Sequence, residues 1–153
     1  MNNQNFDIMD NQNLPLYKLT FKGYWREINK AGIPNEAGIY IVYRAVYNAF
    51  QGTIDPKEII YIGQAGKGGA RVGDHDKLPQ FKTYLKEGEE LCYAFAKVDK
   101  ENLDIVENAL VFMQKPHEND YLKDSYNHEE ASFQVNGDTA CLKMTKFSIT
   151  KTK

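Results

Sequence analysis

The sequence has few cysteines, no long apolar run and no basic leader, and each shortage excludes a class of protein. Its two cysteines, Cys92 and Cys141, each lie in an apolar stretch, so we expect two buried thiols and neither a disulfide scaffold nor a zinc site. No run approaches the roughly 18 apolar residues that a membrane helix needs. The Asn/Gln-rich first 13 residues lack the pattern of a secretory signal, and we expect them to be disordered. These absences predict a cytoplasmic protein without a membrane partner.

The sequence also lacks the positive charge that proteins binding nucleic acid usually carry, since its formal net charge is -2. The charges are unevenly distributed, however. Residues 64–86 contain five bases and two acids, whereas residues 117–130 contain five acids and one lysine. A basic surface on an acidic protein is therefore compatible with this sequence, at modest affinity for a polyanion. We expect Lys67 and its basic neighbours to line that surface and the acidic loop 117–130 to lie to one side.

Apolar and aromatic residues are plentiful: 42% of the chain is hydrophobic, with ten tyrosines and eight phenylalanines, which is enough for one folded domain. Residues 38–46 alternate in the manner of a strand, with Ile39, Ile41 and Tyr43 on one face. We expect this strand to pair with a second at 58–63 as a long hairpin. A third strand is expected at 91–98, and a helix at 102–115 that stops before a proline.

The rest of the chain is less regular. Residues 16–29 fit a short helix or a strand and turn, while helices are expected after the glycine-rich turn 64–69 and over 79–87. Asn136-Gly137 predicts a hairpin between strands at 132–135 and 139–149. The element order indicates an α/β fold of the α+β type, with a small central antiparallel sheet flanked by helices. We divide it into an N-terminal extension (1–34), a core (35–130) and a C-terminal hairpin (131–153) of the same domain.

Two tripeptides and five later residues form a recognisable series. Gly38-Ile39-Tyr40 and Tyr61-Ile62-Gly63 fall on the first two expected strands. The elements that follow are an Arg with a His four residues later, a Glu within an apolar helix, and an Asn shortly after a Pro. The chain therefore resembles the GIY-YIG nuclease superfamily across about residues 38–119. The later elements of the series are Arg71, His75, Glu107, Pro116 and Asn119.

The resemblance implies a metal-dependent endonuclease that hydrolyses phosphodiester bonds, with DNA as the expected substrate and RNA as the alternative. It implies one divalent cation, Mg²⁺ or alternatively Mn²⁺, on Glu107. It further implies that Tyr40 helps to activate or position the attacking water, and that Tyr61 orients the phosphate or the water. Asn119 is expected to support the site rather than react, with Asn127 as a substitute.

The residues themselves fit this chemistry. Leu103, Leu110 and Val111 lie four before, three after and four after Glu107, which places this carboxylate in an apolar stripe, where a cation is a natural partner. Arg71 offers a planar fork of donors for a phosphate, and His75 can relay a proton near neutral pH. Whether Tyr40 or His75 is the base is left open. The lysines expected to contact nucleic acid are Lys67, Lys77 and Lys82.

Other readings stay open. The main alternative is a catalytically silent module of the same fold that binds nucleic acid or a protein, although the intact site residues argue against it. The chain shows no zinc finger, helix-turn-helix or basic helix, so specificity is expected to come from the N-terminal segment, the hairpin insertion, the C-terminal hairpin or a protein partner. Sequence-specific and structure-specific cleavage, the biological pathway and the oligomeric state are not decided by the sequence.

Overall fold

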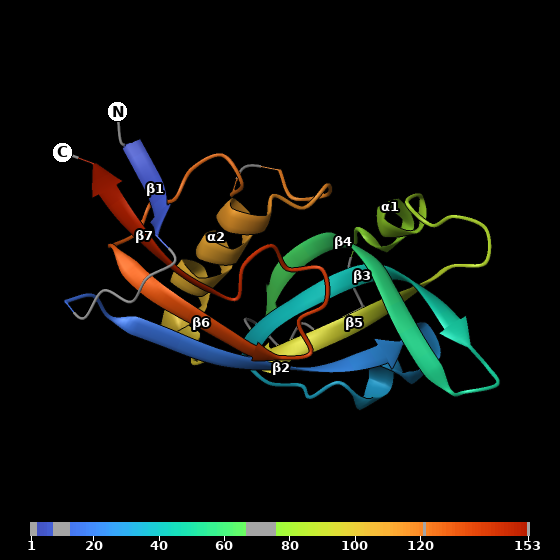
Figure 1. Ribbon diagram of the computed structural model, residues 1–153. Helices are drawn as coiled ribbons and strands as arrows, with labels where there is room; N and C mark the ends of the chain where they lie inside the picture. Colours follow the sequence, from blue (N-terminus) through green and yellow to red (C-terminus); the bar gives the residue numbers. More distant parts are fainter. Residues whose placement is uncertain (1–2, 8–12, 67–75, 121, 153) are drawn as a thin grey trace.

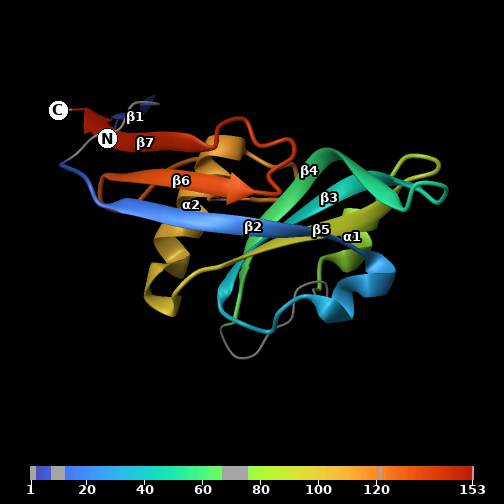
Figure 2. The same ribbon diagram turned by 60° about the horizontal axis from the view of Figure 1, so that its bottom comes forward.

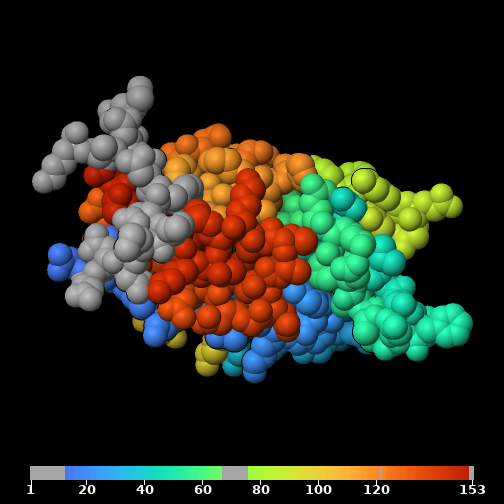
Figure 3. Space-filling view, viewed as in Figure 1, coloured from blue at the N-terminus to red at the C-terminus, as the bar shows by residue number. Residues whose placement is uncertain are grey.

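The most extensive strand pairing joins β3 (Gly38–Asn48) to β4 (Thr53–Ala65) and confirms the predicted hairpin. The computed structural model describes residues 3–7, 13–66, 76–120 and 122–152. Strand β5 (Glu90–Lys97) pairs with the other side of β3, as the prediction of a strand at 91–98 required. The turn between β3 and β4 projects from the body of the molecule as the teal lobe of Figure 3, and Phe50 within it is fully exposed.

Within the described residues, seven strands form one sheet in the order β1-β7-β6-β2-β5-β3-β4. The four further strands are β1 (Asn3–Asp7), β2 (Leu16–Arg26), β6 (Ala131–Gly137) and β7 (Lys146–Thr152). Strand β2 runs between β5 and β6, as Figure 2 shows, and it is antiparallel to β5 but parallel to β6. The sheet is therefore mixed and larger than the small central antiparallel sheet that was expected, although β2, β5, β3 and β4 are antiparallel to one another along the sheet.

Two α-helices and two 3₁₀ helices accompany the sheet in the described part of the chain: η1 (Glu27–Gly32), α1 (Leu78–Lys82), η2 (Lys100–Asn102) and α2 (Leu103–Gln114). Helix α2 confirms the predicted helix and ends at Gln114; the next residue, Lys115, adopts a left-handed conformation before Pro116. Helix α1 is shorter than the predicted helix over 79–87. None of these helices combines the length and apolar character needed to cross a membrane.

The sheet has a core on each face because β3 is buried on both. Ile39, Ile41 and Tyr43 pack against α2 in the larger core, as the alternation predicted. Tyr40 and Val42 point to the opposite face, where they meet residues of α1 and of the segment after η1. In Figure 1, α2 and α1 accordingly lie apart, with α2 against one end of the sheet and α1 beside β4.

Three further expectations are wrong. Residues 3–7 form β1, paired with β7, although residues 1–13 were expected to be disordered. The C-terminal strands β6 and β7 do pair antiparallel as the predicted hairpin, but Asn136-Gly137 is not its turn. Instead β6 continues along β2 as far as Gly137, whose partner is Phe21, and residues 138–145 connect β6 to β7. Cys92 is buried but Cys141 is exposed, because Cys141 falls in this connection.

Candidate active site

The candidate site begins at the outer edge of β4, the last strand of the sheet in the described residues. The buried side chain of Asn119 covers part of this edge. Its Oδ1 accepts a hydrogen bond from the N–H of Ile62 at 3.0 Å, and its Nδ2 donates to the carbonyl of Ile62 at 2.8 Å. The N–H of Glu118 also donates to the carbonyl of Ile60. The segment after α2 is therefore fixed to β4 beside the second tripeptide, where an unpaired strand edge would otherwise be open.

A small hollow of about 200 Å³ lies at this edge. It is bounded by β4, by Lys77 just before α1, by α2 and by the segment after α2, so residues far apart in the sequence meet in it. Three of its side chains carry a carboxylate and one carries an ammonium group. The lining residues are Tyr61, Lys77, Glu107, Glu118, Asn119, Asp120 and Leu122.

Tyr40 and Tyr61 lie side by side on the face of the sheet opposite α2, with ring centroids 6.0 Å apart. Tyr40 pairs with Gly63, and both rings lean over that glycine. A Cβ atom added to Gly63 would come within 2.6 Å of the Tyr61 ring and 2.9 Å of the Tyr40 hydroxyl. Glycine at this position therefore lets the two tyrosines approach each other, which gives the last residue of the second tripeptide a physical role.

Gly38, the first residue of the other tripeptide, lies under a different ring. A Cβ atom there would come within 2.4 Å of the Phe95 ring and 2.3 Å of the carbonyl oxygen of Ala96. Both tripeptides thus place a glycine where an aromatic side chain crosses the neighbouring strand. Because these two glycines have no side chain, the rings on the Tyr40 face have room to lie over them. Their role is to admit the rings, not to form a turn.

Glu107 is half-buried on α2 and is oriented by Gln64, the residue directly after the second tripeptide. Nε2 of Gln64 donates to Oε1 of Glu107 at 2.7 Å and to Oδ1 of Asp104 at 2.9 Å. Glu107 and Tyr61 line the same hollow. The expected metal ligand and one of the two expected catalytic tyrosines therefore share one site. Sequence reasoning missed Gln64, although its place beside the tripeptide was the available signal.

Buried Asn108 holds the loop that follows. Its Nδ2 donates to the carbonyls of Leu122 and Ser125, and its Oδ1 accepts from the N–H of Asn127. Asn127 is exposed and takes part through its backbone, whereas Asn119 contacts β4 with its side chain. Asn119, and not its expected substitute, is thus the asparagine at the site.

The surroundings of Tyr40 favour its neutral form. Burial is the main cause that raises the pKa of its hydroxyl, and the nearby groups of Tyr61 and Glu107 raise it further. Tyr40 consequently holds its proton at neutral pH in the protein alone. A cation beside Glu107 would oppose this effect, because positive charge favours the phenolate.

The charges in the hollow differ from the expected basic surface. Lys77 lines it as predicted, but its Nζ lies 3.2 Å from Oε2 of Glu118 and 3.7 Å from Oδ2 of Asp120. The expectation that the acidic loop lies to one side is wrong, since Glu118 and Asp120 line the hollow. The cause is the docking of this segment on β4. Lys82 is exposed on α1 and is not part of the lining.

Three expected site residues, Lys67, Arg71 and His75, lie outside the described residues, which omit 67–75. Of the rest, Tyr61, Glu107 and Asn119 share the hollow, and Tyr40 contacts Tyr61 beside it. The candidate site therefore combines β3, β4, α2 and the segment after α2.

The donor groups at the site fit one hard divalent cation. In the described ranges, no group of three or more His, Cys, Asp and Glu side chains forms a complete metal site. Mg²⁺ does not need one, because it commonly binds through one or two carboxylates and completes its shell with water and phosphate oxygens. Glu107 supplies a carboxylate. Beside it, the buried Oε1 of Gln64 has no hydrogen-bond partner in the described structure. An amide oxygen of this kind can bind a hard divalent cation.

Comparison of this chain with protein-family models, with curated proteins and with solved structures finds no match.

Proposed function

We propose that the protein is a metal-dependent endonuclease of the GIY-YIG type, which hydrolyses phosphodiester bonds of nucleic acid, with DNA as its substrate. The observation that carries this proposal is the convergence of Tyr40, Tyr61 and Glu107 at one edge of the sheet. These residues come from β3, β4 and α2 and are separated by up to 67 positions in the sequence.

In the proposed reaction a water oxygen forms a bond to phosphorus while the bond to one sugar oxygen breaks. The water loses a proton, and the departing oxygen gains one. Negative charge grows on the phosphoryl oxygens at the same time, so the site must supply positive charge and a route for protons.

Glu107 would hold the divalent cation, with Gln64 orienting its carboxylate from β4. When bound, such an ion neutralises the phosphoryl oxygens and makes a coordinated water more acidic. The ion is also required for electrostatic reasons, because Glu107, Glu118 and Asp120 would repel a phosphate from the hollow in its absence.

Tyr40 would position the attacking water with its hydroxyl, and Tyr61 would orient the phosphate or the water at the mouth of the hollow. Asn119 would hold β4 and the segment after α2 in place without entering the reaction. Arg71 and His75 would add the guanidinium for the phosphate and a second proton carrier, as the family resemblance implies.

The test is a comparison of wild type with Glu107→Gln on labelled DNA and RNA substrates, in Mg²⁺ and in chelator. We expect Mg²⁺-dependent cleavage by the wild type and none by Glu107→Gln. The variant should also lose the increase in melting temperature that Mg²⁺ gives the wild type, because a ligand that binds only the native state stabilises it.

Glu101→Gln is the matched control, because Glu101 is exposed in η2, just before the same helix, and should behave as wild type. A silent module of the same fold would bind nucleic acid without cutting it in any metal. Cleavage by Glu107→Gln at the wild-type rate would refute the assigned role of this residue.

A further inference from the structure

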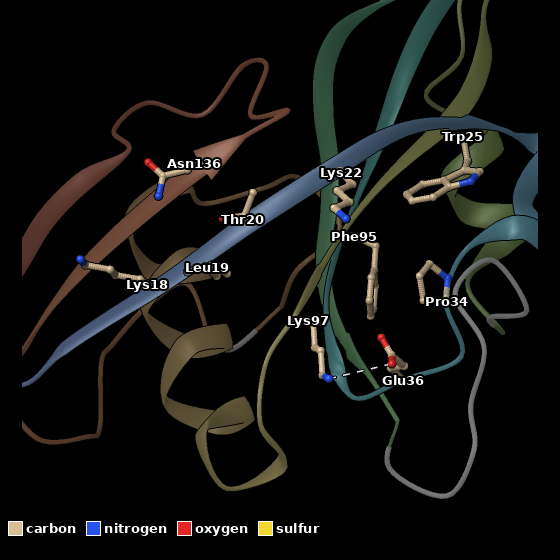
Figure 4. Close-up of a pocket in the computed structure, with 10 residues that line it drawn as sticks. All are labelled: Lys18, Leu19, Thr20, Lys22, Trp25, Pro34, Glu36, Phe95, Lys97 and Asn136. Carbon is tan, nitrogen blue, oxygen red and sulfur yellow. Dashed lines mark ion pairs between the residues drawn. The ribbon is translucent and has the colours of Figure 1, made fainter.

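A second concavity lies away from the candidate active site, on the face of the sheet opposite α2. It is a groove of about 480 Å³ over β2 and β5, and Figure 4 shows the side chains that line it. Three lysines line this groove against a single acid, Glu36, which lies 4.0 Å from Lys97. The groove is thus the reverse of the acidic hollow in charge. The residues used in the argument are Lys18, Lys22, Lys97, Trp25 and Phe95.

The alternation of β2 places two of these lysines in the groove. Leu19 and Phe21 are buried in the core beneath α2, so Lys18 and Lys22 project from the opposite face. Both lysines are exposed, and so is Lys97 on β5. Exposed positive charges that line one groove repel one another, and an anionic ligand would relieve that repulsion.

Aromatic side chains accompany the lysines. Trp25, at the end of β2, is half-buried with its indole against Gly32 of η1, and Phe95 forms part of the floor. In Figure 4 the Trp25 and Phe95 rings both border the groove, and Lys22 lies beside them. Ammonium groups beside an aromatic face are the combination that binds a single-stranded polynucleotide, because phosphates pair with the cations and unpaired bases stack on the ring. Trp25 offers that face, since Phe95 is buried.

The groove is connected to the candidate active site by the register of the sheet. Lys22 pairs with Phe95, Phe95 with Tyr40, and Tyr40 with Gly63, so one transverse row runs across β2, β5, β3 and β4 on one face. Three strand spacings of about 4.8 Å give a span of ~14 Å. That distance corresponds to at most about four phosphates, since a strand stacked as in B-DNA rises ~3.4 Å per phosphate and an extended single strand rises more. Phe95 and Tyr40 are buried, so a bound strand would cross above the middle of this row.

We propose that the groove formed by β2 and β5 binds a single-stranded stretch of nucleic acid, and that the substrate carries this stretch a few nucleotides from the bond that is cut. The second part rests on the proposed nuclease function. The first part concerns binding alone and stands independently of any cleavage. A flap, an overhang or an unpaired strand has this character, whereas a fully paired duplex does not.

Trp25 makes binding in the groove directly observable, because it is the only tryptophan of the chain. The experiment titrates wild-type protein, in chelator to prevent cleavage, with oligothymidylate, oligouridylate and a blunt duplex while tryptophan fluorescence is recorded. We expect both single strands to quench the fluorescence and the duplex to bind at least tenfold more weakly. A difference between the two single strands would tell DNA from RNA.

Salt dependence counts the phosphate contacts. Three lysines predict that log K falls with log salt with a slope of about −2, since each contact to a single strand contributes about −0.7. Lys18→Ala and Lys22→Ala should each reduce this slope by about 0.7. Lys143→Ala is the matched control, because Lys143 is exposed but lies away from the groove. It belongs to the connection between β6 and β7, in which the carbonyl of Ala140 accepts a hydrogen bond from Tyr43 on the α2 face.

Stacking is tested with a labelled oligonucleotide and fluorescence anisotropy. Trp25→Ala should weaken binding about five- to hundredfold, whereas Trp25→Phe, which keeps a ring in place, should stay near wild type. The lysine variants keep the test decisive if Trp25→Ala does not fold, because Lys18 and Lys22 are exposed.

If polyglutamate binds as tightly as oligothymidylate, the partner of the groove is an acidic protein and not a nucleic acid, and the proposal is overturned. Unchanged salt slopes in both lysine variants would also overturn it. If single strands bind in the groove but no substrate is cut in Mg²⁺, the groove assignment stands and the nuclease proposal fails. If blunt duplexes are cut as fast as flaps and without dependence on Lys22, the nuclease proposal stands and the groove assignment fails.

Discussion

Asn119 and Ile62 are joined by two hydrogen bonds in which a side-chain amide takes the position of a neighbouring strand. The amide satisfies both backbone groups of Ile62 on the outer side of β4. It also holds Glu118 and Asp120 at the hollow, so one side chain influences both the stability of the sheet edge and the charge of the site.

Replacement of Asn119 by Ala should lower the free energy of unfolding by about 2–4 kcal/mol, because two hydrogen bonds are lost and two buried backbone groups lose their partner. Urea denaturation measures this loss. Asn127→Ala is the control: the exposed side chain of Asn127 donates a hydrogen bond to Ser125, and its loss should cost no more than about 0.5 kcal/mol. Equal losses in the two variants would contradict the strand-like role of Asn119.

Gly63→Ala should displace the two tyrosine rings, since the new methyl group would lie within 2.9 Å of both. We expect a destabilisation of about 1–3 kcal/mol from overpacking, together with a loss of cleavage. A double-mutant cycle with Tyr61→Ala checks the cause, because the methyl group should cost less once the Tyr61 ring is removed. An unchanged cost in that background would mean that the strain arises elsewhere.

Tyr40→Phe should lower the cleavage rate by about 10²- to 10⁴-fold, the range for removal of a group that handles a proton. Affinity for the substrate and thermal stability should change little, because the ring that fills the core remains. Single-turnover cleavage and anisotropy measured on the same variant separate the two effects. A wild-type rate would leave Tyr40 with a packing role only and would move the base assignment to His75.

The protein should lose stability at alkaline pH. Burial raises the pKa values of Tyr40, Tyr43 and Tyr93 well above their ordinary value of about 10. The folded protein therefore keeps these protons after the unfolded chain has begun to lose them. This stabilisation is complete below pH ~10 and falls as the pH rises further.

Chemical denaturation at several pH values between 8 and 11 measures that fall. In Tyr43→Phe one titrating hydroxyl is absent, so stability should decline less steeply above pH ~10, although the hydrogen bond to the carbonyl of Ala140 is also lost. A decline as steep as in the wild type would show that other groups control the alkaline transition.

The elements that the sequence predicts well are those whose side chains repeat with a clear period. The alternation of Ile39, Ile41 and Tyr43 indicates a strand, and the apolar stripe around Glu107 indicates a helix; the structure has both. Polar and apolar residues alternate equally clearly over residues 18–22. The aromatic residues nearby, however, fitted a short helix as well as a strand, so the sequence did not decide between them. That uncertainty concealed the groove, because its lysines are recognised only once β2 is known to be a strand.

Pairings between distant segments were harder to predict. Asn136-Gly137 has the local preference of a tight turn, but hydrogen bonds from β2 continue to Gly137 and override it. The acidic loop could not be placed at the hollow from its charge, because its position follows from Asn119 and Ile62, which are 57 residues apart. Tyr40, Tyr61, Glu107 and Asn119 were identified through the family resemblance, and no periodicity would have shown that they lie near one another.

The parallel pairing of β2 with β6 has a consequence for how the chain folds. Leu16 pairs with Ser132 and Phe21 with Gly137, so these contacts span 116 residues. The β3–β4 hairpin can form as soon as its own residues are available, but β2 lacks one neighbour until β6 has been synthesised. Contacts of such long range slow folding, because the intervening loop must close before they form. During synthesis this side of β2 is therefore open to pairing with another chain, and a chaperone that protects this protein would be expected to cover it.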